Sequence, residues 1–306
     1  MEISVVNLQE HDCLATLPGR TLHCNGLFAK NEYAPSHLLR VDQMLRSFKL
    51  GISYDGTGYA GWQVQPRQLT VQGMLERAVA KLTGERVVVT GSGRTDSGVH
   101  ALAQVGSLTT DAWRASAASL MRAMNTKLPP DIVVVEAAEM PLYFHAIRDA
   151  VGKRYRYQVQ VGGIRNAFEH RYRLHVPYRL DVPAMRDAAG RLVGKLDFAS
   201  FQAAGADRLT TVRDVRALDL IVEEGRGDAV YLDIEIEADG FLYNMVRNIV
   251  GSLLEVGRGK QTPEWIDFLL DVKDRDKAGP TAPALGLFLI RVDYDIQPIL
   301  DQGELP

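Results

Sequence analysis

Two strand-like segments that follow one another without an intervening helix limit the fold of this chain more than any other feature. Residues 212–222 and 229–238 are rich in aliphatic and β-branched side chains, and only a short charged stretch with two glycines separates them. Successive strands of a parallel sheet need a crossover connection, which is usually a helix. The pair therefore disfavours a purely parallel doubly wound sheet and favours an α+β fold built on a largely antiparallel sheet.

Helical and strand patterns alternate along the rest of the chain. Alternating apolar residues predict strands at 48–54, 86–90, 132–135, 154–161 and 287–294. Apolar residues at helical spacing predict helices at 70–83, 112–125, 182–193, 242–256 and 262–270. Thr70 and Asp181 each stand where an N-terminal helix cap is expected. We therefore expect two mixed helix and strand halves, residues 48–150 and 151–306, with a cleft between them.

The first 47 residues show neither the alternation of a strand nor the spacing of a helix over a sustained length, and they mix prolines and glycines among scattered apolar residues. Met44 lies just before the first clear strand pattern. We interpret residues 1–47 as an N-terminal extension that is flexible or not translated. A chain that starts at Met44 is then expected to fold and function.

Composition excludes several classes of protein. The 306 residues are 46% hydrophobic and 24% charged, as in a globular protein. No apolar run reaches the roughly 18 residues of a spanning helix, and the start is acidic where a signal peptide is basic. Cys13 and Cys24 are too few for a disulfide framework or a four-ligand metal site. We interpret the chain as cytoplasmic, with no membrane segment and, in the absence of a P-loop, dinucleotide or zinc-deaminase motif, no cofactor or metal.

Positive charge is concentrated in residues 145–173, although the whole chain has a net charge of −3. This segment has seven cationic residues against two acidic ones, with three tyrosines interleaved. The cationic residues are Arg148, Lys153, Arg154, Arg156, Arg165, Arg171 and Arg173. Arginines mixed with aromatic residues bind phosphates and stack on bases. A solvated face whose charges are balanced by other parts of the chain is the alternative that the sequence leaves open.

The segment GSGRTDSGVHALAQV, residues 91–105, is the densest in residues that carry chemistry. Three glycines and two serines surround Asp96 directly after a run of three valines, which indicates a tight loop at a sheet edge. By spacing alone, an Asp that only bonds its own backbone in a turn remains possible. His100 and His145 lie in no metal-binding or Ser/His/Asp spacing, so we expect structural roles for both.

The motif GRTDSGVHA resembles the signature loop of the tRNA pseudouridine synthase A family. Further segments resemble the family in the same chain order, and together the matches extend over residues 48–294. These segments are YDGTGYAGWQVQ, GKRYRYQV, FLYNMVRNIVGSLLEVGRGK and AGPTAPALGLFL. The resemblance implies isomerisation of uridine to pseudouridine at positions 38, 39 and 40 of tRNA, without a cofactor, by a homodimer.

The resemblance also implies roles for individual residues. Asp96 corresponds to the catalytic aspartate, Arg247 to the arginine that pairs with it, and Arg94 to the arginine that precedes it in the loop. Tyr155 corresponds to the tyrosine that packs against the target base, although the pattern alone also suits an ordinary core tyrosine. The catalytic cleft would then lie between the half with Asp96 and the half with Tyr155 and Arg247.

Three arginines are candidate RNA contacts. Arg154 and Arg156 alternate with Tyr155 along one strand, so they lie on its polar face. Arg148 follows the FHA motif one place later than the family's arginine does. Two other classes of protein stay open: a catalytically silent RNA-binding module, and a hydrolase with an aspartate nucleophile.

Overall fold

The computed structural model describes residues 15–17, 20–22, 44–203, 210–225 and 227–299. Met1–Gln43 and Met44–Pro306 are separate compact units. In the first unit, β1 (Ala15–Leu17) and β2 (Arg20–Leu22) pair antiparallel. The sequence did not predict this hairpin, because strands of three residues are too short to show a period. The other residues of the expected extension before Met44 lie outside the described residues.

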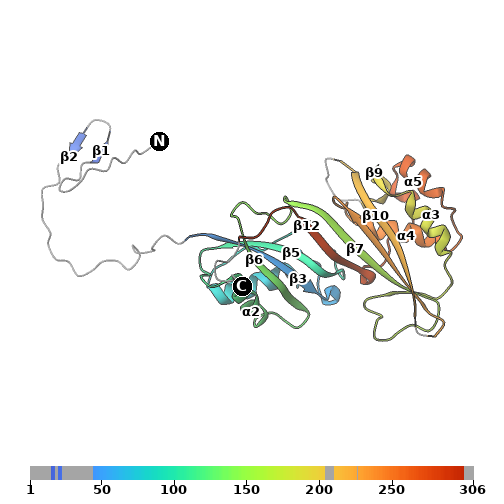
Figure 1. Cartoon of the computed structure of the whole chain (residues 1–306), viewed down its shortest axis with the longest axis horizontal. Coiled ribbons are helices and arrows are strands. Elements are labelled where there is room, and N and C mark those ends of the chain that lie inside the picture. Colours follow the sequence, from blue (N-terminus) through green and yellow to red (C-terminus); the bar gives the residue numbers. More distant parts are fainter. Residues whose placement is uncertain (1–14, 18–19, 23–43, 204–209, 226, 300–306) are drawn as a thin grey trace. The chain divides into compact units, whose positions relative to one another are not determined.

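One continuous sheet is the framework of the second unit (Figure 1). The order of its main strands is β6-β3-β5-β12-β7-β11-β10-β9, with β4 paired to β5 and β8 paired to β7. The strands are β3 (Arg46–Tyr54), β4 (Thr90–Gly91), β5 (His100–Thr110), β6 (Ile132–Met140), β7 (Ala150–Val161), β8 (Leu174–Val176), β9 (Gly194–Asp197), β10 (Val212–Glu224), β11 (Val230–Ala238) and β12 (Leu287–Tyr294). Among the described residues, only the pairs β12–β5 and β7–β8 are parallel. The predicted α+β fold on a largely antiparallel sheet is confirmed.

The last strand of the chain lies in the middle of this sheet. β12 pairs parallel with β5, where Phe288 is opposite His100, and antiparallel with β7, where Leu289 is opposite Tyr155. β10 and β11 form the hairpin that their direct succession predicts, with Leu220 opposite Ile234. The sheet therefore continues through both predicted halves, and the division near residue 150 stays a prediction.

The helices are α1 (Val71–Thr83), α2 (Ala117–Asn125), α3 (Val182–Gly190), α4 (Met245–Gly257) and α5 (Trp265–Val272), and the 3-10 turns are η1 (Gly56–Gly58), η2 (Ala199–Phe201), η3 (Arg275–Lys277) and η4 (Ala284–Gly286). The hydroxyl of Thr70 accepts a hydrogen bond from the Gly73 amide, and Asp181 accepts one from the Ala184 amide, so both predicted caps are confirmed. Three helices begin later than predicted, α2 at Ala117, α4 at Met245 and α5 at Trp265. Figure 1 shows α3, α4 and α5 together next to β10, whereas α2 lies beside β6.

The strand predicted at 86–90 is reduced to Thr90–Gly91. Val87 and Val89 are buried and Val88 is exposed, so the side chains alternate as in a strand. However, the Val89 amide donates to the carboxylate of Glu76 instead of to a neighbouring strand. The alternation of a strand is therefore present at Val87–Val89, but these residues are not hydrogen-bonded to a neighbouring strand in the described part of the chain.

One apolar core runs the length of the sheet and contains buried residues of all five helices. In β7, Tyr155, Tyr157 and Val159 face this core, and Arg154 and Arg156 alternate with them, as the sequence predicts. At β7 the sheet therefore has an apolar face in the core and a polar face with the arginines. In the part of the chain that the structure describes, no helix is both long and apolar enough to span a membrane.

Candidate active site

Asp96 lies in the loop that joins β4 to β5, and hydrogen bonds fix this loop from several sides. The Trp62 amide donates to the Thr95 carbonyl at 3.0 Å, and the Tyr54 hydroxyl lies 2.8 Å from the Thr95 hydroxyl. Within the loop, the Val99 amide donates to the Asp96 carbonyl at 3.1 Å. The aspartate is therefore presented by a fixed backbone rather than by a loose turn.

Gly61 allows the segment around Trp62 to lie directly against this loop. Its φ is +91°, and a Cβ atom at this position would lie 2.5 Å from the Thr95 carbonyl oxygen. Only glycine has both the left-handed conformation and the missing side chain that this approach requires. The YDGTGYAGWQVQ motif thus packs against the backbone of the Asp96 loop and supports it.

Asp96 and Arg247 form the ion pair that the family resemblance implies. The Arg247 Nη1 atom lies 3.3 Å from the Asp96 Oδ2 atom. Arg247 also donates from Nε to the Ala282 carbonyl at 2.7 Å and from Nη1 to the Asn244 side-chain oxygen at 2.9 Å. Asn244 has φ +59° at the start of α4, and its contact with Arg247 was not foreseen. These acceptors orient the guanidinium toward the carboxylate.

Burial raises the pKa of Asp96 above its ordinary value, and the neighbouring Arg247 opposes this shift without cancelling it. The Asp96 side chain is 27% exposed, so it remains accessible to a substrate. A carboxylate with a raised pKa is more basic than one in water. A perturbed carboxylate with an arginine partner is typical of a catalytic group, although structural ion pairs also perturb pKa values.

Tyr155 lies on the core face of β7, where burial raises the pKa of its phenol and the charges of Tyr54 and Asp96 add to the shift. Burial is the largest cause of that shift, and it keeps the phenol neutral. The ring is 8% exposed and contacts Phe241 edge to face, with the ring centroids 5.1 Å apart. The structure therefore brings Asp96, Arg247 and Tyr155 together.

Arg94 is exposed and makes no ion pair or side-chain hydrogen bond with any described residue. It is two residues from Asp96 in the same loop. Its guanidinium is therefore available to a phosphate or another anion.

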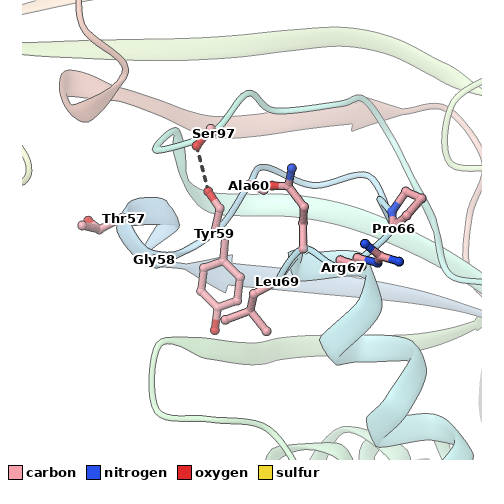
Figure 2. A pocket seen from close by; sticks show the side chains of 9 residues that line it. Thr57, Gly58, Tyr59, Ala60, Pro66, Arg67, Leu69 and Ser97 are labelled. Atoms are coloured by element: carbon pink, nitrogen blue, oxygen red, sulfur yellow. Dashed lines mark hydrogen bonds between the residues drawn. The ribbon is translucent and has the colours of Figure 1, made fainter.

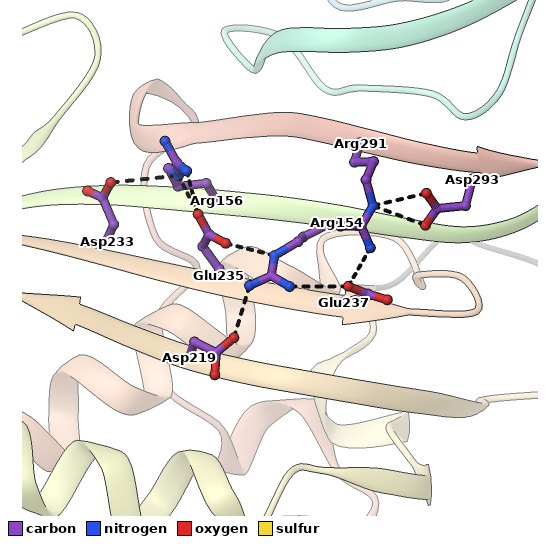
Figure 3. A network of polar contacts seen from close by, with 8 residues as sticks. All are labelled: Arg154, Arg156, Asp219, Asp233, Glu235, Glu237, Arg291 and Asp293. Carbon is purple, nitrogen blue, oxygen red and sulfur yellow. Dashed lines mark hydrogen bonds and ion pairs between the residues drawn. The ribbon is translucent and has the colours of Figure 1, made fainter.

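Arg154 and Arg156 belong to a network of charges (Figure 3). They alternate with Tyr155 along β7, so they lie on the opposite face of the sheet. Arg154 pairs with Glu235 at 2.7 Å and also with Asp219 and Glu237, and Arg156 pairs with Glu235 as well. Acidic residues of β10 and β11 thus balance these arginines, as the alternative interpretation of the charge pattern anticipates. Arg148 is paired with the adjacent Asp149 at 2.8 Å. RNA contacts by these three arginines stay predictions.

His100 has a structural environment at the start of β5. It is 1% exposed and stacks on Phe288 with the ring centroids 4.6 Å apart. Its Nδ1 atom accepts from the Gly56 amide at 3.1 Å, and its Nε2 atom lies 3.1 Å from the Arg171 carbonyl. Burial lowers the pKa of this histidine, which favours the neutral ring. No sequence pattern predicts that His100 joins the YDG motif to the segment at Arg171.

An open pocket of about 560 Å³ lies beside the Asp96 loop (Figure 2). Its wall at the loop is Ser97, whose hydroxyl donates to the Tyr59 carbonyl at 3.1 Å. The other lining residues are Thr57, Gly58, Ala60, Pro66, Arg67, Gln68 and Leu69. Across the described ranges, no group of three histidine, cysteine or acidic residues is placed to hold a metal ion.

Comparison with known proteins identifies the family of this chain. The family model described as tRNA pseudouridine synthase matches residues 52–148 and 188–295. The tRNA pseudouridine synthase A of Thermoanaerobacter sp. (strain X514) is 43% identical over 250 residues, which are 82% of this chain and 100% of that protein. The protein of the same name from Pelobacter propionicus is 44% identical over the same shares. This chain therefore belongs to the tRNA pseudouridine synthase A family.

Proposed function

We propose that this protein converts uridine to pseudouridine at positions 38, 39 and 40, in the anticodon stem and loop of tRNA. The observation that carries the proposal is the ion pair formed by Asp96 and Arg247. The Arg247 Nη1 atom lies 3.3 Å from the Asp96 Oδ2 atom, and the Asp96 side chain is still accessible to a substrate. The family membership supplies the substrate class. The positions modified are those that the resemblance implies.

The reaction is an isomerisation that needs one carboxylate and no co-reactant. The bond between N1 of uracil and C1′ of ribose breaks, the base rotates, and C5 bonds to C1′. The proton leaves C5 and N1 becomes an N–H, so no atom of the nucleoside is lost overall. Asp96 acts either as a nucleophile at C1′ or as a base at C2′, and both roles require its ionised form.

The other residues of the site position the substrate. Arg247 holds the Asp96 carboxylate in one orientation through a charge-assisted contact. A uridine must leave its stack to reach the carboxylate, and the Tyr155 ring, braced edge to face by Phe241, is the surface that receives the base. Arg94 supplies an unpaired positive charge for the RNA phosphates next to the target uridine. By the same resemblance, we expect a homodimer in the cytoplasm, and sedimentation of the purified protein tests the dimer.

Substitution Asp96→Asn tests the proposal. It keeps the shape of the side chain and removes its charge, so we expect a loss of about 10⁴-fold or more in the rate of pseudouridine formation. Affinity for tRNA should stay within about tenfold of wild type, because removing a negative charge does not weaken binding to a polyanion. Asp271→Asn, on the exposed side of α5, is the matched control and should keep full activity.

Two further measurements complete this test. Thermal melting of both variants separates lost chemistry from lost folding. Mapping pseudouridine in tRNA from cells that lack the protein shows which positions depend on it. Substantial pseudouridine formation by a folded Asp96→Asn variant would remove Asp96 from the catalytic role. Turnover by the wild type would also exclude both a silent RNA-binding module and a hydrolase.

A further inference from the structure

The cationic side chains of this protein fall into two groups that the sequence does not distinguish. In the described parts of the chain, Arg154, Arg156 and Arg173 each pair with a carboxylate. By contrast, Arg165 and Arg171 are exposed and have neither an ion pair nor a side-chain hydrogen bond with any described residue. An arginine that is already paired must break that pair to bind a phosphate. The unpaired arginines are therefore the stronger candidates for phosphate contacts.

Both unpaired arginines lie in the loop of residues 162–173, which follows β7. β12 is parallel to β5 and antiparallel to β7, so β7 ends at the edge of the sheet where β5 begins. At this edge the Arg171 carbonyl lies 3.1 Å from the His100 ring, and the Tyr172 hydroxyl donates to Asp55 at 2.9 Å. The loop is therefore attached to the strand that directly follows the Asp96 loop.

The tip of this loop exposes two large apolar side chains. Ile164 is 94% exposed and Phe168 is 92% exposed, more than any other large hydrophobic residue among those described. Exposed aromatic rings flanked by arginines suit stacking on unpaired bases. The positive charges of Arg165 and Arg171 beside these apolar side chains fit a contact with a polyanion better than a contact with a second copy of the chain.

Hydrogen bonds from the end of β7 hold the tip of the loop in place. The buried Gln160 donates from Nε2 to the Ile164 carbonyl at 2.8 Å and accepts from the Asn166 amide at 3.1 Å. The Asn166 side chain in turn accepts from the Phe168 amide at 3.0 Å. Because these bonds fix the backbone on both sides of the tip, Phe168 is presented as a preorganised surface.

We propose that the loop of residues 162–173 is a second tRNA contact, outside the site of the target uridine. Phe168 stacks on an unpaired base, and Arg165 and Arg171 contact the phosphates on either side of it. The proposal rests on the proposed function, because it takes tRNA as the substrate. It places the contact at the sheet edge that carries Asp96, and not on the polar face that carries Arg154 and Arg156.

Binding of unmodified tRNA to the full chain tests this proposal. Phe168→Ala should weaken binding by about 5- to 100-fold, since stacking of one base on an aromatic ring is of this size. Phe268→Ala, which removes a half-exposed phenylalanine from α5, is the matched control and should leave affinity unchanged. The rate of a single turnover at saturating tRNA should stay within about twofold of wild type in both variants, because neither residue touches the reacting atoms.

The salt dependence of binding tests the arginines. Replacing Arg165 and Arg171 together by alanine should reduce the slope of log affinity against log salt by about 1.4 to 1.8, which corresponds to two lost phosphate contacts. The same double replacement at Arg154 and Arg156 should leave the slope unchanged. A slope that falls only in this second variant would overturn the proposal and place the tRNA on the polar face of the sheet.

Two other results would also overturn the proposal. Unchanged affinity in a folded Phe168→Ala variant that still forms pseudouridine would remove the loop from the tRNA surface while leaving the proposed function intact. A dissociation of dimers into monomers by Phe168→Ala, with unchanged affinity of each monomer for tRNA, would make the tip an interface between copies. If the tip contributes to tRNA binding but no pseudouridine forms, the proposed function fails and the contact stands.

Discussion

Gly61→Ala is the substitution for which the structure makes the most specific prediction. The added Cβ would lie 2.5 Å from the Thr95 carbonyl oxygen, 3.0 Å from the Asp96 carbonyl carbon and 3.2 Å from the Ser97 amide nitrogen. Real Cβ atoms essentially never come within 3.0 Å of another atom, and ordinary contacts begin at 3.4 Å. The Asp96 loop must therefore move by about 0.5 to 0.9 Å, or the segment at Gly61 must move by the same amount.

A displacement of this size matters more for catalysis than for folding. Misplacing a reacting group by about 1 Å lowers a rate by about 100-fold, so we expect a fall of about 10- to 100-fold in single-turnover pseudouridine formation. The left-handed backbone adds strain of about 1 to 2 kcal/mol once a Cβ is present. Thermal melting should therefore shift down by a few degrees while the protein stays folded.

Gly84→Ala is the matched control for this prediction. Gly84 has φ +77° at the end of α1, and a Cβ added there meets no atom within 4 Å. This variant has a similar backbone strain without the clash, so it should melt at a lower temperature and keep its rate. An unchanged rate in Gly61→Ala, or an equal loss of rate in Gly84→Ala, would refute the claim that contact with the loop backbone positions Asp96.

Four further outcomes follow from the structure. Because burial raises the pKa of Asp96 and the reaction needs the ionised form, the single-turnover rate should rise with pH through a midpoint above the ordinary aspartate range. Arg247→Met removes the group that lowers this pKa, so the midpoint in a pH profile should move higher and the rate should fall. Gln160→Leu should weaken tRNA binding in titrations without moving that midpoint, since Gln160 holds only the loop tip. A chain starting at Met44, which begins the second compact unit, should keep the melting temperature and rate of the full chain.

Local patterns predicted the elements that carry a clear period, but they missed the strands β5, β8 and β9. Alternation along 154–161 assigns Tyr155 to the core and Arg154 to the polar face, and both assignments are confirmed. The final strand has the predicted bounds, Leu287–Tyr294. Its position between β5 and β7 could not be predicted, since the period of one strand does not specify its neighbours. The continuous sheet depends on that position.

The candidate site was only partly accessible from the sequence. Helical spacing places Arg247 on the flank of an apolar stripe, but its pairing with Asp96, 151 residues away, came from the family resemblance. The left-handed Asn244 that orients Arg247 has no sequence pattern of its own, because asparagine adopts this conformation in many turns. The supporting role of Gly61 likewise depends on a tertiary contact.

The distribution of charge along a sequence is a poor guide to the charge that a partner meets. Residues 145–173 have a cationic excess, yet Arg154 and Arg156 both pair with Glu235, which is about 80 positions later in the chain and lies on the neighbouring strand. Arg165 and Arg171 come from the same segment and have no such neighbour among the described residues, because their loop extends beyond the paired strands. A polyanion is attracted by the charge that remains after local pairing. The loop beyond the end of β7, rather than the middle of the strand, therefore presents the unpaired positive charge of this segment.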